Sequence, residues 1–385
     1  MTMESHVKER YSQGAKEFEA ALCCPVDYDQ DLLKILPREI IDRDYGCGDP
    51  SRYVRGGETV LDLGSGGGKI CYMAAQLVGK GGQIIGVDMN DDMLALARNH
   101  QGEMAQVLGE DRVRFHKGRI QDLALDLDRM AAYLKEHPVT DLASADAFQA
   151  WQDQTRQNNP MIPDNSVDLV VSNCVLNLVD DRQKRQLVEE IYRVVKPGGR
   201  VAISDIVSDV PVPETLKQDP TLWSGCISGS FDEAGFVAAF QEVGFVGVTY
   251  DKWDAAPWQV VEGIEFRSAT LTAVKSPIHR QTERGHGVIY RGPLAVVEDE
   301  LGNRYPAGVR IAVSEEVFNR LGEGVFADQF VRLSPAKPLL PTPFTAPPGT
   351  RRDPVITRGG SVGSDGAGIA GLKGDNACTP GGGCC

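Results

Sequence analysis

The fold is decided by the stretch Thr59–Met93, which reads TVLDLGSGGGKICYMAAQLVGKGGQIIGVDMNDDM. Its apolar run Val60–Leu63 predicts a buried strand, and the next five residues, Gly64–Gly68, form a glycine-rich turn. Helical spacing of the apolar residues follows over Lys69–Val78. Glycine is favoured in such a turn because the backbone must bend sharply and let a ligand approach where a Cβ would collide. The stretch therefore predicts a strand, a ligand-binding turn and a helix.

A second apolar run, Gln83–Val87, ends in Asp88, about twenty residues beyond the glycines, where a carboxylate can accept hydrogen bonds from a ribose diol. The glycines are spaced as Gly64-x-Gly66-x-Gly68, whereas a dinucleotide fingerprint would place its third glycine at Lys69. Together with Asp62, this pattern resembles the first motif of class I methyltransferases that bind S-adenosylmethionine. A site for NAD and a plain structural turn are the alternatives.

Length and charge limit the remaining function classes. The chain has 385 residues and a net charge of −14, and no basic stretch offsets that charge, which argues against nucleic acid or an anionic membrane as a partner. No apolar run reaches the ~18 residues of a membrane helix, and the polar start is unlike a signal peptide. We expect a cytoplasmic monomer. Its nine cysteines then indicate thiols for metal, metalloid or redox work, although a small core residue is the favoured interpretation for Cys71.

The chain divides into four parts. Residues 1–55 are expected to form an N-terminal helical extension that acts as a lid, with a helix over 7–22 before Cys23 and Cys24 and with Cys47 on a loop that can close over the crevice. Residues 56–274 form the methyltransferase domain. Strands that alternate with helices in this domain predict an α/β fold, a doubly wound, mostly parallel sheet of the seven-strand, Rossmann-like type. A helix-rich insertion over 123–158 carries no recognisable chemistry. A small β-rich module is expected over 275–335, and the proline- and glycine-rich tail 336–385 is expected to be disordered, with thiols at Cys378, Cys384 and Cys385.

Three cysteines lie on three separate loops near the expected crevice. Cys174 follows the fourth strand, predicted over 167–172, Cys226 lies in the glycine-rich loop after the fifth strand, and Cys47 lies in a tight turn just before the first strand. Ligands of open α/β sheets bind outside the carboxyl ends of the strands. We therefore expect the three thiols to converge beside the methyl donor, the alternative being three isolated small residues.

These cysteines also carry a family resemblance. The segments 45–48 (YGCG), 172–178 (SNCVLNL), 192–199 (YRVVKPGG), 204–205 (SD) and 222–226 (LWSGC) resemble those of the arsenite methyltransferases over roughly residues 7–335. The resemblance implies that Cys47, Cys174 and Cys226 bind As(III) as three thiolates, that Cys174 and Cys226 hold the monomethylated intermediate, and that Cys23 or Cys24 pairs with Cys47 in a redox cycle. Departures are Lys69-Ile70, where the family usually has arginine and aspartate, the residues after Cys226, and the 123–158 insertion.

The chemistry agrees with this resemblance. As(III) is soft, so thiolates are its preferred ligands, and a trigonal S₃ site leaves its lone pair free to attack the methyl carbon in line. No general base is needed, and an external thiol reductant of the thioredoxin or glutathione type is implied. Methylation of a small organic acceptor, of antimony or of selenium, and sequestration of a metalloid without catalysis, are the rival functions.

The expected cofactor residues follow from their places after the strands. Met89 and Ile120 would cover the adenine, Gln121 would contact its edge, and Asn173 would contact the methionine moiety. The full set comprises Asp62, Gly64, Ser65, Gly66, Gly68, Asp88, Met89, Ile120, Gln121 and Asn173.

Overall fold

The computed structural model describes residues 2–17, 19, 26–276 and 281–363. The chain divides into two compact units, Met1–Ser276 and Pro277–Cys385, and each is described by itself. The predicted thiols Cys23, Cys24, Cys378, Cys384 and Cys385 lie outside the described residues.

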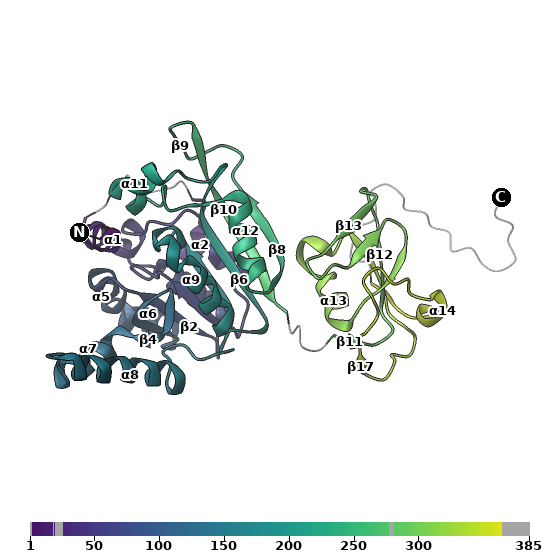
Figure 1. The fold of residues 1–385 in the computed structure, drawn as a ribbon, viewed down its shortest axis with the longest axis horizontal. Helices are drawn as coiled ribbons and strands as arrows, with labels where there is room; N and C mark the ends of the chain where they lie inside the picture. The colour runs from purple at the N-terminus through teal and green to yellow at the C-terminus, as the bar shows by residue number, and fades with distance from the viewer. Residues whose placement is uncertain (1, 18, 20–25, 277–280, 364–385) are drawn as a thin grey trace, which may run out of the picture. The chain divides into compact units, whose positions relative to one another are not determined.

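The first unit is built on one mixed sheet with the strand order β4-β3-β2-β1-β5-β6-β10-β8 (Figure 1). The strands β3, β2, β1, β5 and β6 are parallel, whereas β4, β10 and β8 are antiparallel to their neighbours. This arrangement confirms the predicted Rossmann-like fold. The bounds are β1 (Thr59–Leu63), β2 (Gln83–Asp88), β3 (Val113–Arg119), β4 (Asp122–Asp126), β5 (Val167–Asn173), β6 (Val195–Ser208), β8 (Phe245–Trp253) and β10 (Ile264–Lys275), with β7 (Phe231–Asp232) beside β6 and β9 (Gln259–Val261) beside β10.

Both faces of the sheet are covered by helices, so its central strands are apolar on both sides. In β1, Val60 belongs to one buried apolar cluster and Leu61 to another, since alternate side chains of a strand point to opposite faces. The cluster of Val60 includes residues of α4 (Lys69–Val78), whose predicted bounds are confirmed, and of α5 (Asp91–Asn99). That of Leu61 includes residues of α9 (Asp181–Val194) and α12 (Glu233–Glu242). Helix α6 (Gln101–Leu108) follows α5 along the chain.

Two sequence predictions in this unit need correction. The N-terminal helix α1 spans Met3–Gly14 rather than 7–22, and it ends where Gly14 meets Tyr45 so closely that a Cβ would lie 2.8 Å from the ring. The 123–158 insertion begins with most of β4, whose Leu123–Leu125 are buried, and only then continues as helices. The remaining elements are α2 (Gln30–Leu33), α3 (Arg38–Asp42), η2 (Pro50–Tyr53), α7 (Leu127–Glu136), α8 (Leu142–Asn158), η3 (Leu176–Leu178), α10 (Glu214–Lys217) and α11 (Pro220–Ser224).

The second unit is a small β-rich fold with the strand order β15-β12-β16-β18 and two further strand pairs, β11-β17 and β13-β14. The prediction of a disordered tail is wrong over residues 336–363, because this segment forms β17, α14 and β18. Its Arg352 is buried, pairs with both carboxylate oxygens of Glu283 at 2.9 Å and donates to His286 O. The bounds are β11 (Thr282–Glu283), β12 (Gly287–Tyr290), β13 (Val296–Glu298), β14 (Arg304–Pro306), β15 (Arg310–Ala312), α13 (Glu315–Arg320), η4 (Gly324–Phe326), β16 (Phe330–Leu333), β17 (Thr342–Pro343), α14 (Pro354–Thr357) and β18 (Val362–Gly363).

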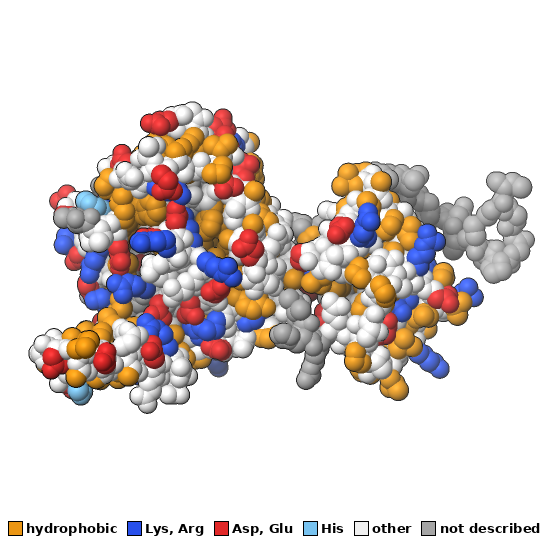
Figure 2. All heavy atoms as spheres, viewed as in Figure 1, with side chains coloured by type: hydrophobic (Ala, Val, Ile, Leu, Met, Phe, Trp, Pro, Cys, Tyr) orange, Lys and Arg blue, Asp and Glu red, His pale blue; other side chains and the backbone are white. Residues whose placement is uncertain are grey.

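The surface is mixed in charge. On the face drawn in Figure 2, basic side chains alternate with acidic ones and do not gather into one large basic patch. Within the described ranges, no helix has both the length and the apolar character that crossing a membrane requires.

Candidate functional site

A cavity of about 750 Å³ opens at the carboxyl ends of β1, β2 and β5, where the topology predicts a ligand. Nine of the ten expected cofactor residues line it; they are Asp62, Gly64, Ser65, Gly66, Asp88, Met89, Ile120, Gln121 and Asn173. The tenth, Gly68, has another role. It precedes α4 with φ +87°, and a Cβ there would lie 2.9 Å from the ring of Phe115, so this glycine lets the helix pack close to the sheet.

The glycine turn and Asp88 form one hydrogen-bonded unit. Gly66 N donates to Asp88 Oδ2 and Asn90 N donates to Asp88 Oδ1, both at 2.8 Å, which fixes the carboxylate at the end of β2. Gly66 has φ +51°, and a Cβ there would meet only Met93 Sδ at 4.0 Å. A side chain at this glycine would therefore occupy cavity space, as expected of a turn that admits a ligand.

Asp62 lies beneath the turn with one thiol as its partner. Burial raises the pKa of Asp62 to about 8, although the hydrogen bond from Cys71 acts to lower it. Cys71 Sγ donates to Asp62 Oδ2 at 3.2 Å, and burial raises the pKa of this thiol. Cys71 is fully buried, so the small-core-residue interpretation describes its place, with this hydrogen bond added.

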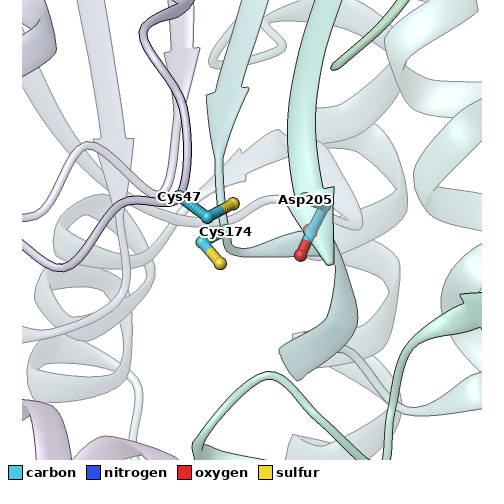
Figure 3. A group of neighbouring side chains, drawn as sticks. All are labelled: Cys47, Cys174 and Asp205. Carbon is cyan, nitrogen blue, oxygen red and sulfur yellow. The ribbon is translucent and has the colours of Figure 1, made fainter. Parts of the chain in front are cut away.

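The thiols gather next to this cavity. Cys47, Cys174 and Asp205 are buried, and their sulfur and carboxylate atoms all lie within 4.8 Å of one another (Figure 3). Cys226 belongs to the same buried cluster but not to this group of three, and its Sγ donates to Cys174 O at 3.0 Å. Of the three predicted thiols, Cys174 lines the cavity itself.

Backbone strain marks two of the cysteines. Four described residues other than glycine have a positive φ, and two of them are Cys174 (φ +63°) and Cys226 (φ +61°). This region is unfavourable for a side chain with a Cβ, and such strain concentrates at functional sites. The two loops thus hold Cys174 and Cys226 in a left-handed backbone conformation that residues with a Cβ rarely adopt.

Asn173 fixes the loop that carries Cys47. Its Oδ1 accepts from Cys47 N at 2.9 Å and Gly48 N at 3.0 Å, while its Nδ2 donates to Gly48 O and to Tyr28 Oη. All four hydrogen-bonding positions of the amide are used. Asn173 lines the cavity, as expected, and it also connects the end of β5 to the Cys47 loop, which the sequence pattern did not indicate.

Asp205 was not among the predicted site residues. It accepts from Leu176 N at 2.9 Å, Asn177 N at 3.4 Å and Ile206 N at 2.8 Å, so it holds the turn that follows Cys174. Burial raises the pKa of Asp205 to about 7, against the lowering effect of these three donors. The available signal was its place next to Ser204, which pairs with Asn173 at the end of β5, because the rule used for Cys174 applies to this neighbouring strand as well.

Helix α1, in the extension that the sequence predicts to be a lid, forms a further wall of the site. Its Tyr11 lines the cavity and lies with Oη 3.9 Å from Cys226 Sγ. Burial, chiefly, raises the pKa of this tyrosine. Arg10 ties α1 to the loop of Cys226 by donating to Thr221 O and Ser224 Oγ, each at 3.0 Å. The polar N-terminal sequence does not single out Tyr11 or Arg10 as the residues through which α1 contacts the site.

Comparisons with known proteins agree with this geometry. A family model described as a methyltransferase domain matches residues 55–135 and 146–255, and a domain of unknown function (DUF8838) matches 278–362. An arsenite methyltransferase from Mus musculus is 30% identical to this chain, and the match covers 82% of this chain and 77% of the relative. One from Aquipseudomonas alcaligenes is also 30% identical, and the match covers 73% of this chain and 75% of the relative. The chain belongs to the arsenite methyltransferase family.

A solved structure shares the fold. The crystal structure of an arsenic (III) S-adenosylmethionine methyltransferase from Chlamydomonas reinhardtii superposes with a TM-score of 0.54 at 24% identity, covering 84% of this chain and all of the other. This arsenite methyltransferase family member is an S-adenosylmethionine-dependent enzyme.

Proposed function

We propose that the enzyme methylates trivalent arsenic held by cysteine thiolates beside the donor cavity. The observation that carries the proposal is that Cys174 lines the cavity and also lies within 4.8 Å of the Cys47 thiol and the Asp205 carboxylate. Two buried thiols at this place can bind a soft, thiophilic acceptor such as As(III), whereas methylation of an organic acceptor does not require them. The relatives named as arsenite methyltransferases support the same substrate.

The cavity residues fit S-adenosylmethionine. The Asp88 carboxylate suits a ribose diol, Gly64 and Gly66 leave room for close approach, and Met89 and Ile120 give apolar contact to an adenine. When bound, the cofactor supplies an electrophilic methyl carbon. Gln121 would offer the adenine edge a hydrogen bond, and Asn173 would face the methionine moiety while it holds the Cys47 loop.

Arsenite would exchange oxygen for sulfur as it binds. Each As–S bond that forms displaces one hydroxide, which leaves as water with the proton of that thiol. Cys47 and Cys174 lie together, and Cys226 completes the trigonal site once its thiol turns from Cys174 O toward the arsenic. Held in this way, the arsenic would direct its lone pair toward the methyl group that the cofactor supplies. Transfer would release S-adenosylhomocysteine and formally oxidise the arsenic from As(III) to As(V).

Reduction completes the cycle. We propose that the thiolate of Cys23 or Cys24 attacks the sulfur of arsenic-bound Cys47, so that the two cysteines form a disulfide. The Cys47–As bond breaks, and its electron pair returns the arsenic to As(III). An external reductant of the thioredoxin or glutathione type restores the thiols, which suits a monomeric enzyme in the reducing cytoplasm. Cys174 and Cys226 would retain the monomethylated arsenic for a further turn.

Speciation of arsenic products is the direct test. The full chain is incubated with arsenite, excess thiol and S-adenosylmethionine, and methylated arsenic and S-adenosylhomocysteine are both measured. We expect them to appear together and Cys174→Ser to abolish both. Because Cys174 lines the cavity but serine is close to it in size, the Kd for S-adenosylmethionine should change less than about threefold. Transfer to an organic acceptor that survives Cys174→Ser would overturn the proposal in favour of a conventional methyltransferase. Arsenite binding without consumption of the cofactor would favour sequestration.

A further inference from the structure

Lys69 is a buried cation next to the glycine turn. It is the first residue of α4, it is 5% exposed, and it does not line the cavity. Its Nζ lies 3.1 Å from Asp44 Oδ2 and 3.4 Å from the centre of the Tyr28 ring. A buried ammonium needs such partners, because removal from water is costly unless a carboxylate or an aromatic face replaces the lost solvation.

The Asp44 carboxylate also orients Tyr28. Tyr28 Oη donates its one proton to Asp44 Oδ2 at 3.0 Å, the oxygen that Lys69 contacts. The hydroxyl oxygen is then left as an acceptor, and Asn173 Nδ2 donates to it at 3.2 Å. The charged pair thereby decides which way the tyrosine proton points.

The tyrosine in turn helps to set the Asn173 amide. With Nδ2 toward Tyr28, Oδ1 faces the Cys47 and Gly48 N–H groups and accepts from both. In the reversed amide, NH₂ would face those two donors and leave them unsatisfied, at a cost of about 1–3 kcal/mol for each buried group. A defined chain of contacts therefore runs from the donor loop to the thiol loop.

We infer that Lys69 is a positioning residue for Cys47, acting through Asp44, Tyr28 and Asn173, and that it links the methyl-donor loop to the arsenic-binding loop. The inference deepens the proposed function and rests on it for the identity of the substrate. Asn173 holds the backbone of the Cys47 loop, and Lys69, Asp44 and Tyr28 act on that loop through the contacts that lead to Asn173.

The test uses the full chain with three variants and one control. Lys69→Met removes the charge at similar size, Lys69→Arg keeps it, and Tyr28→Phe removes the hydroxyl through which the chain passes. Lys80→Met is the matched control, since Lys80 is exposed just beyond the other end of the same helix.

Two readouts separate positioning from general damage. The first is kcat/KM for arsenite together with the Kd for S-adenosylmethionine. The second is the rate at which iodoacetamide alkylates Cys47, measured by mass spectrometry and divided by the rate at Cys71. Cys71 is fully buried on α4 itself, so loosening of the helix would raise its rate as well.

We expect Lys69→Met to lower kcat/KM for arsenite about tenfold and to raise the Cys47-to-Cys71 ratio about fivefold, as a small misplacement of a reacting group would. In Lys69→Arg, kcat/KM for arsenite should stay within about threefold of the wild-type value. The Kd for S-adenosylmethionine should also change less than about threefold in every variant. Because the residues act in series, Lys69→Met combined with Tyr28→Phe should be little worse than the stronger single variant.

Two results would overturn the inference. One is that the losses of kcat/KM caused by Lys69→Met and by Tyr28→Phe multiply in the double variant. The other is that Lys69→Met keeps the wild-type ratio of the Cys47 alkylation rate to the Cys71 alkylation rate. Failure of the proposed function looks different, because the wild-type enzyme would then form no methylated arsenic while the alkylation ratio still responded to Lys69→Met.

Discussion

The two halves of the site are built in different ways. The donor half lies mostly within one βαβ unit, and its main connection, Gly66 N to Asp88 Oδ2, joins residues 22 positions apart. The thiol half is assembled from distant loops, and the bonds that hold Cys47 come from Asn173, 126 positions away, and from Ser268, 221 positions away. A local motif thus binds the donor, whereas the acceptor site depends on the completed fold. Substitutions should therefore separate the two halves.

The largest separation is expected from Cys47→Ser. Loss of one of the two adjacent thiols should lower arsenic methylation about a hundredfold or more, because serine is a poor ligand for As(III) and the lone pair is no longer aimed at the methyl carbon. The Kd for S-adenosylmethionine, measured by calorimetry, should change less than about twofold, since Cys47 does not line the cavity. A parallel loss of cofactor binding would show that the halves are not separable.

The converse variant is Asp88→Ala. It removes the carboxylate that both orders the glycine turn and faces the cavity, so the Kd for S-adenosylmethionine should weaken about tenfold to a hundredfold, as for loss of a charge-assisted hydrogen bond. Arsenite binding measured without the cofactor should not change. If arsenite binding weakened to the same degree, the donor turn would be supporting the thiol loops.

The same contrast explains what the sequence could predict. The bounds of α4 and the place of Asp88 follow from periodicity and glycine chemistry within a short window, and both agree with the structure. Ligands of parallel sheets bind at the carboxyl ends of the strands, and this rule correctly predicts the place of Cys174. The same rule holds for Asp205 on the neighbouring strand, which lies beside Cys174. The tail prediction was wrong over 336–363 because composition does not reveal that Arg352 finds a buried partner in Glu283. The Arg352–Glu283 contact joins residues 69 positions apart and has no signal in local sequence.

A milder disturbance of the thiol half is Gly46→Ala. A Cβ at this position would lie 1.9 Å from Asn173 Nδ2, so the Cys47 loop or the amide must move. We expect kcat/KM for arsenite to fall about tenfold, since near-attack geometry tolerates little displacement. Gly56→Ala is the control, because no atom lies within 4 Å of a Cβ there and its φ is not positive. Equal effects at the two glycines would contradict the steric explanation.

The donor half should also have its own pH dependence. Burial raises the pKa of Asp62 to about 8, so the folded enzyme retains a proton that the unfolded chain releases above about pH 4. Raising the pH from about 5 to about 8 should therefore lower the free energy of unfolding. Asp62→Asn has no proton to lose, and its melting temperature without cofactor should fall less over this range. The exposed Asp31→Asn should retain the wild-type slope.

The smallest effect is expected where α1 meets the Cys226 loop. Arg10→Ala removes the bonds to Thr221 and Ser224 together with an ion pair to Glu19, and Arg38→Ala, which removes an exposed ion pair to Asp42, is its matched control. Tyr11, one residue further on, lines the cavity and approaches Cys226, so the helix contacts both the donor space and the third thiol. We expect the KM for arsenite to rise about threefold with little change in kcat, consistent with the loss of one or two hydrogen bonds that are not to the substrate. A larger rise in the KM for S-adenosylmethionine than for arsenite would assign α1 to the donor half instead.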